Sequence, residues 1–220
     1  MDDPIPVFPL GTVLFPGTVL PLHIFEERYR LLVRDLLDGP EPRAFGVVAI
    51  ELGHEVGPGA ARRLADVGCT AVLRQVLAHE GGRFDIVTVG DTRFRISEVD
   101  DSRPYLRASV TPLPDEAGAD PDETAREVDR LFRRYLGRLA DIGAQVSASA
   151  DLPDDPVRLS YAVAGALVVG QQEKQRLLEA ADAAVRLRME ADLLTREILR
   201  LGRLPGIPAT GFPGGGPHPN

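Results

Sequence analysis

Residues 70–96 read TAVLRQVLAHEGGRFDIVTVGDTRFRI, and this stretch decides the fold class. Residues 70–77 are a β-prone run, and in residues 84–89 Phe, Ile and Thr alternate with Asp and Val, as in a strand with two different faces. The segments His-Glu-Gly-Gly and Gly-Asp-Thr, on either side of residues 84–89, indicate turns. We therefore expect a three-stranded antiparallel meander whose last strand contains residues 93–96.

The residues around the meander extend this β-rich half. Four prolines within residues 6–21 exclude a helix at the start of the chain. An apolar stripe over residues 25–36 then predicts one helix, which a Gly-Pro pair ends. Residues 44–50 and 105–110 are expected as strands, and residues 51–66 are expected as a long loop whose role is left open.

After a proline-containing linker, residues 112–121, the apolar period becomes helical and stays so. Asp120-Pro121 and Asp155-Pro156 both indicate helix starts, because Asp caps a helix and Pro suits its first position. A short helix is expected over residues 172–181. The last predicted helix carries an apolar seam of Leu187, Ala191, Leu194, Ile198 and Leu201. This seam is expected to pack inside a bundle, with a partner helix or a dimer as the alternative.

These patterns predict an α+β protein with twisted antiparallel sheets in the N-terminal part and a helical bundle in the C-terminal part. The expected domains are residues 1–114, which are β-rich, and residues 115–204, which are helical. Residues 205–220 hold five prolines and little that can pack, so a flexible Pro/Gly tail is expected there.

Composition limits the classes of function. The chain has 220 residues, a formal net charge of −8 and an apolar fraction of 44%. Both halves are acidic, with 12 basic and 16 acidic residues in 1–114 and 13 and 17 in 115–204, which argues against nucleic-acid binding. The apolar runs are far shorter than the roughly 18–20 residues of a membrane span, and the acidic start is unlike a secretory signal. We expect a cytoplasmic protein that binds no membrane.

No pattern of catalytic or cofactor-binding residues appears in the sequence. Lys174 is the only lysine and lies among Gln and Glu, where a solvated position is expected, so a P-loop is absent and a dyad with Ser160 is disfavoured. The four histidines lack metal-ligand spacing, and His23 is expected to be a hydrogen-bonded structural residue. Cys69 is expected to pack as a small apolar side chain. The sequence therefore predicts no enzyme, no cofactor and no metal.

The opening of the chain resembles a known family. Residues 8–17 read FPLGTVLFPG and residues 20–29 read LPLHIFEERY, and both closely resemble the start of the N-terminal substrate-binding domain of Lon proteases. Further segments of the chain resemble later parts of that domain: residues 68–71, 82–90, 93–96, 104–108, 160–164, 173–179 and 186–187. The resemblance covers roughly residues 4–202.

The resemblance implies a PUA-like β-barrel followed by a helical bundle, and a role in binding unfolded or tagged polypeptides. Full Lon proteases carry an ATPase domain and a Ser-Lys peptidase domain after this region, and this chain ends where they would begin. We therefore expect a stand-alone, non-catalytic member of the family, acting as an adaptor or regulator in protein quality control. A protease or a chaperone would be a further partner.

An open barrel could bind a polypeptide through a strand edge and an apolar groove. The opening of the chain has more apolar side chains than one short segment easily buries. The candidate peptide-binding residues are Phe8, Leu10, Phe15, Phe25 and Tyr29. The alternative is that these side chains simply form core.

RNA binding is the alternative function, because PUA-like barrels elsewhere bind RNA. Arg62-Arg63 and Arg133-Arg134 are the clustered basic residues that such a function would use. Other arginines, such as Arg28, Arg93 and Arg95, are expected to pair with nearby carboxylates.

Overall fold

The structure, a computed structural model, describes residues 4–53, 55, 57, 61–144 and 151–203. The predicted flexible tail lies outside these residues. In chain order the described elements are β1 (Ile5–Leu10), β2 (Val19–Ile24), α1 (Glu27–Asp38), β3 (Ala44–Gly53), β4 (Ala61–Leu64), β5 (Val67–Ala78), the 3₁₀ turn η1 (Glu80–Gly82), β6 (Phe84–Asp100), β7 (Arg107–Pro112), α2 (Pro121–Asp141), α3 (Pro156–Ala166), α4 (Gln171–Glu179) and α5 (Ala183–Leu201).

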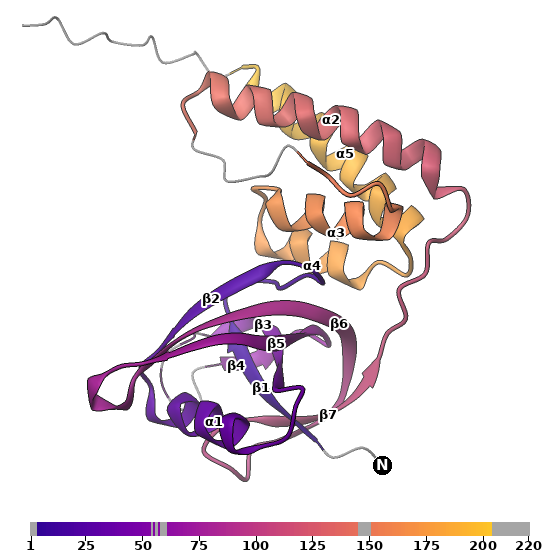
Figure 1. The fold of residues 1–220 in the computed structure, drawn as a ribbon. Coiled ribbons are helices and arrows are strands. Elements are labelled where there is room, and N and C mark those ends of the chain that lie inside the picture. The colour runs from indigo at the N-terminus through magenta and orange to yellow at the C-terminus, as the bar shows by residue number, and fades with distance from the viewer. Residues whose placement is uncertain (1–3, 54, 56, 58–60, 145–150, 204–220) are drawn as a thin grey trace, which may run out of the picture.

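Five of the strands close into a ring. β1 pairs in parallel with β3, and antiparallel pairs then join β3 to β5, β5 to β6, β6 to β7 and β7 back to β1. Closure leaves no free edge within the ring, which is how small barrels avoid exposed strand edges. The helices α2 to α5 stack on one side of this barrel, and α1 lies on the opposite side (Figure 1).

The predicted second turn of the meander is wrong. β6 runs without a break from Phe84 to Asp100, so one 17-residue strand replaces two shorter ones. Gly90 is needed for a close contact instead of a turn. A Cβ atom built on Gly90 would lie 2.1 Å from the carbonyl oxygen of Phe15, and Gly17 N donates a hydrogen bond to Gly90 O at 2.8 Å. The sequence signal of this glycine therefore marks the packing of another segment against the strand.

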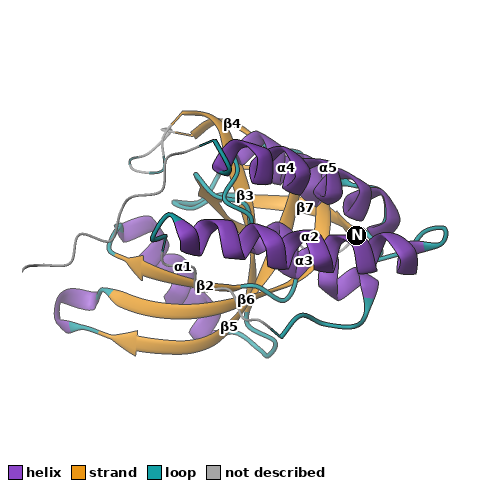
Figure 2. Ribbon diagram, turned by 90° about the horizontal axis from the view of Figure 1, so that it is seen from above, coloured by secondary structure: helices purple, strands orange, loops and turns teal. Residues whose placement is uncertain are grey.

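The length of β6 creates a three-stranded extension of the barrel. Its first half pairs with β2 and its second half pairs with β7, whereas β5 pairs with both halves along the other side. Figure 2 shows β2, β6 and β5 side by side in this extension. The predicted loop over residues 51–66 is also partly wrong, because β3 continues to Gly53 and β4 lies within that range.

The helical half confirms the predicted order of helices but only one of the two predicted caps. Asp155 accepts a hydrogen bond from Arg158 N at 2.8 Å, as an N-cap should. Asp120 has a φ of 50° and makes no capping bond, so its predicted cap is wrong. The α+β class is confirmed, whereas the division into domains at residue 114 stays a prediction.

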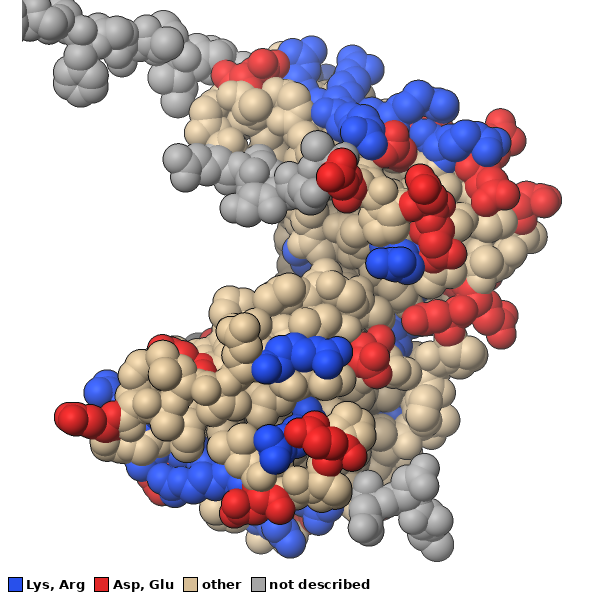
Figure 3. Space-filling model, in the orientation of Figure 1, with Lys and Arg blue, Asp and Glu red and all other residues tan. Residues whose placement is uncertain are grey.

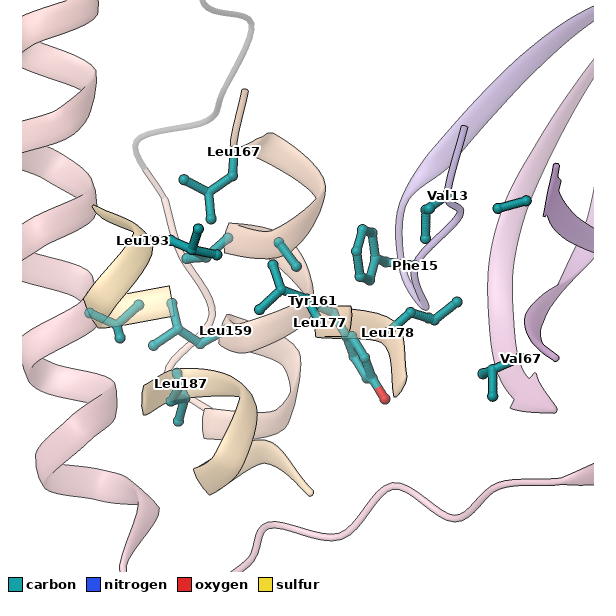
Figure 4. Close-up of a cluster of buried hydrophobic side chains, with 14 of the residues drawn as sticks. Val13, Phe15, Val67, Leu159, Tyr161, Leu167, Leu177, Leu178, Leu187 and Leu193 are labelled. Carbon is teal, nitrogen blue, oxygen red and sulfur yellow. The ribbon is translucent and has the colours of Figure 1, made fainter. Parts of the chain in front are cut away.

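Two apolar cores follow from this arrangement. One lies between the barrel extension, β1 and α1, and includes Phe8, Ile24, Tyr29 and Phe45. The other joins the barrel to the helical bundle, and Figure 4 shows Phe15 and Val13 of the barrel side turned toward the helices that carry Tyr161 and Leu177. The seam of α5 belongs to this second core through Leu187, Leu194 and Ile198. The seam therefore packs within the chain, and the dimer stays a prediction.

Buried polar side chains also hold the barrel to the bundle. Arg93 of β6 is 2% exposed, and its three side-chain nitrogens donate to Asp115 Oδ1 at 3.2 Å and to the carbonyl oxygens of Pro114, Leu178 and Ala180 at 2.7 to 2.9 Å. Asp115 also accepts a hydrogen bond from the hydroxyl of Tyr161. Arg93 does pair with a carboxylate, as predicted, but its main role is to tie the two halves together.

Candidate functional site

A small groove opens where β2 leads into α1. It is lined by Phe8, Leu10, Leu22, His23, Ile24, Phe25, Glu26, Tyr29 and Glu55, and we call it the β1–β2 groove. Its volume is about 120 Å³, well below the roughly 300–1,000 Å³ of typical small-molecule sites. Space of this size and apolar character suits one side chain of another polypeptide better than a cofactor.

The groove lies beside a strand edge. Among the described strands β2 pairs with β6 alone. Gly90 N donates to Thr18 O, so the alternating antiparallel pattern turns the main-chain groups of Val19, Pro21 and His23 away from β6. At this edge Pro21 offers a main-chain carbonyl as acceptor but has no N–H to donate. The free edge of β2 can therefore pair only with a short segment. Five consecutive residues, Leu22 to Glu26, line the groove, so the groove follows the end of the strand.

Stacked aromatic rings form the buried wall of the groove. The rings of Phe8 and Tyr29 are 3.9 Å apart between centroids and nearly parallel, at 14°. The guanidinium of Arg28 lies 4.3 Å from the centre of the Tyr29 ring, a cation–π contact. Burial raises the pKa of the Tyr29 hydroxyl to about 12, so this residue stays neutral at physiological pH. The two stacked rings therefore form an apolar surface without a charge of its own.

The rim of the groove is more exposed. Phe25 is 51% exposed and lies just before α1, so the prediction that the helix begins at this residue is wrong. The ring of Phe25 stacks near His23, with centroids 6.2 Å apart. His23 Nδ1 and His79 Nε2 both hydrogen-bond to the carboxylate of Asp85, at 2.5 and 2.6 Å. The expected hydrogen bond of His23 is thus present, but its side chain is 53% exposed and lies at the surface.

The structure brings four of the five candidate residues together. Phe8, Leu10, Phe25 and Tyr29 line the β1–β2 groove, and Phe25 is the exposed one among them. Phe15 is 1% exposed and packs against Tyr161 on the helical side instead. Leu22 and Ile24 also line the groove and were not among the predicted residues, although their alternation with His23 is a sequence signal that they share a face. Peptide binding by these residues stays a prediction.

The remaining reactive side chains are occupied elsewhere. Lys174 is half-buried and its Nζ donates to Gly165 O at 2.9 Å, so the predicted solvated position is wrong; burial lowers the pKa of its amine. Ser160 donates to Val157 O and accepts from Arg186 Nη1, both at 2.8 Å. Cys69 is fully buried, as predicted, and burial raises the pKa of its thiol to about 12. Neither Ser160 nor Cys69 is placed as an activated nucleophile.

The described part of the chain lacks two further features. No group of three or more His, Cys, Asp or Glu side chains there is arranged to hold a metal ion. No helix in that part is long and apolar enough to cross a membrane.

On the face seen in Figure 3, blue side chains gather over α2, and red side chains lie next to them. Arg133 pairs with Asp129 at 2.9 Å, and Arg63 pairs with Glu51 at 2.6 Å. These pairs compensate two of the arginines that an RNA-binding surface would use.

Comparisons with known proteins agree on one family. The family model of the ATP-dependent protease La (LON) substrate-binding domain matches residues 4–196. Lon protease 2 of Myxococcus xanthus and the Lon protease of Anaeromyxobacter dehalogenans are each 29% identical over 203 residues, which are 90% of this chain. The chain spans about a quarter of the length of these relatives, with 24% of each covered.

Solved structures show the same fold. The N-terminal domain of the Mycobacterium avium complex Lon protease superposes with a TM-score of 0.65 at 22% identity, covering 88% of this chain and 98% of that one. The Lon N-terminal domain protein from Xanthomonas campestris superposes with a TM-score of 0.60, with the same identity and coverage. The barrel, the bundle and the opening motif therefore have one explanation: the chain belongs to the Lon substrate-binding domain family.

Proposed function

We propose that this chain is a non-catalytic polypeptide-binding module that captures unfolded segments at the β1–β2 groove. The observation that carries the proposal is the coincidence of a strand edge with an apolar groove that holds one side chain. Family membership supports it, because the matched family is described as a substrate-binding domain.

The geometry indicates how a segment would bind. An extended chain would pair with the outward main-chain groups of β2 and place one apolar side chain between Phe25 and the Phe8–Tyr29 stack. Main-chain pairing is independent of sequence, so it suits a protein that must accept many clients. A folded client would already pair its own strands and bury its apolar side chains, and would bind poorly.

An adaptor or regulator role in cytoplasmic protein quality control follows as the finer proposal. In that role the barrel would hold a client while a protease or chaperone acts on it. The helical bundle, which is fixed to the barrel through Arg93, would transmit the position of the client to that partner.

Fluorescence anisotropy with a labelled, permanently unfolded polypeptide tests the groove. Phe25→Ser should weaken binding roughly fivefold, because it removes the ring against which the anchoring side chain would pack, and loss of such an aromatic contact costs about 1 kcal/mol. Val168→Ser is the matched control, since Val168 is an exposed apolar residue (69%) in the α3–α4 connection. The proposal fails if wild-type protein does not bind the unfolded polypeptide, or if the two variants lose equal affinity.

A further inference from the structure

The charges around the β1–β2 groove are unequally compensated. Glu26 is held by Arg28 at 3.1 Å and by the main-chain N–H of Gly57 at 3.1 Å, so its charge is largely neutralised. Glu55 is exposed, and its carboxylate accepts a hydrogen bond from the main-chain N–H of Gly11. Among the described residues it has no ion-pair partner.

The arginine nearest to the groove is fully engaged. Arg28 binds Glu26 through Nε and Nη2, donates to the main-chain oxygen of Glu55 at 3.1 Å, and covers the ring of Tyr29. It is only 16% exposed, so it is poorly placed to attract an incoming carboxylate. The third acidic side chain close by, Asp85, binds His23 and His79.

The mouth of the groove therefore carries a net negative charge next to an apolar wall. A residue beside the anchoring side chain of a bound segment would meet Glu55 at the surface, where an opposite charge is attracted and a like charge repelled. The formal net charge of −8 on the whole chain acts in the same direction over longer distances.

We propose that the β1–β2 groove selects extended segments in which one bulky apolar residue is flanked by lysine or arginine, and that Glu55 is the residue that sets this preference. The inference rests on the proposed function, because it concerns the same site. Apolar segments with acidic flanks are the class that the groove discriminates against.

The effect of the Glu55 charge on peptide affinity should be that of a surface ion pair. Such pairs contribute about 0.4–1 kcal/mol, which corresponds to a factor of about two to five in affinity. The preference should shrink when the salt concentration rises from 0.05 M to 0.5 M, because salt screens exposed charges, whereas the contribution of the apolar anchor should persist.

Three labelled peptides with the same single Phe anchor and with Arg, Gln or Glu flanks provide the test. Wild-type protein should bind them with affinity falling from Arg to Gln to Glu. Glu55→Gln keeps an acceptor for Gly11 N–H but removes the charge, and should bring the three affinities together. Glu98→Gln removes the same charge from the exposed face of β6, away from the groove, and should leave the order unchanged.

The outcomes separate this inference from the proposed function. If wild-type protein binds all three peptides equally and Phe25→Ser weakens them all, the groove binds polypeptide but the charge preference is refuted. If Glu55→Gln and Glu98→Gln reduce the preference to the same extent, the total charge is responsible and Glu55 is not. If none of the peptides binds, both proposals are overturned.

Discussion

The two sides of the barrel differ in how completely they are filled. Toward the helical bundle, Phe15 is buried against Tyr161 and the three nitrogens of Arg93 all find acceptors. Toward α1, the β1–β2 groove stays open and Phe25 is half exposed. Under the proposed function, stability depends on one side of the barrel and binding on the other, so substitutions toward the bundle should change mainly stability and those at the groove mainly affinity.

Arg93→Met should have the largest effect on stability. It would leave the carbonyl oxygens of Leu178 and Ala180 buried without their donor, and Asp115 without its cation. Removing one partner of a buried, hydrogen-bonded charge typically costs about 3–5 kcal/mol. Urea denaturation would measure the loss in the free energy of unfolding.

Arg95→Met is the control for that experiment. Arg95 lies two residues further along β6 and is exposed, so its loss should change stability little. Equal destabilisation by the two substitutions would contradict the idea that Arg93 holds the bundle to the barrel.

Two side chains on the helical side, Gln175 of α4 and Glu190 of α5, have buried oxygens without a hydrogen-bond partner among the described residues. Glu190 of α5 is fully buried, and neither carboxylate oxygen has a hydrogen-bond partner among the described residues. Arg186, one turn earlier, is the charged group that acts on it, but its nitrogens donate to Leu177 O, Ser160 Oγ and Tyr161 Oη. Burial therefore raises the pKa of Glu190 well above its ordinary value of 4.5.

This raised pKa makes stability depend on pH. The folded protein binds the proton of Glu190 more tightly than the unfolded chain does. The contribution of protonated Glu190 to the free energy of unfolding is therefore complete below its ordinary pKa of about 4.5. It is lost as the pH rises toward the pKa of the folded state, at about 1.4 kcal/mol per pH unit.

Glu190→Gln, which is neutral at all pH values, should remove this loss. Thermal or urea unfolding should show the variant more stable than wild type at pH 8 and similar to it near pH 4. Glu127→Gln on the exposed face of α2 provides the control and should leave the pH dependence unchanged. An unaltered pH dependence in the Glu190 variant would show that another group is responsible.

Local signals predicted much of the fold. The turn after residue 78 and the Asp-Pro start of α3 depend on neighbouring residues alone, and both are correct. The unbroken β6 could not be predicted from local patterns. Gly90 is required there because the carbonyl oxygen of Phe15, a residue distant in sequence, lies too close to leave room for a Cβ atom. The parallel pairing of β1 with β3, which closes the ring, likewise depends on contacts across the chain.

The site was predicted in part for the same reason. The apolar opening indicated Phe8, Leu10, Phe25 and Tyr29, and these do meet at one groove. The side of the barrel on which Phe15 packs depends on where the bundle docks, which no local pattern encodes. Glu55 had no signal either, because it lies in a glycine-rich stretch and its hydrogen bonds, with Gly11 and Arg28, join residues that are distant in sequence.

The smallest effect on stability is expected for Phe25→Ser, the substitution that should weaken binding most. Phe25 is 51% exposed and belongs to neither buried core, so the free energy of unfolding should change by no more than about 0.5 kcal/mol. Phe15→Ser, at a position 1% exposed, should instead cost about 3–5 kcal/mol. Urea denaturation of both variants compares the two sides directly. A loss above 1 kcal/mol for Phe25→Ser would mean that the groove is part of the core, and that weaker binding by this variant reflects unfolding.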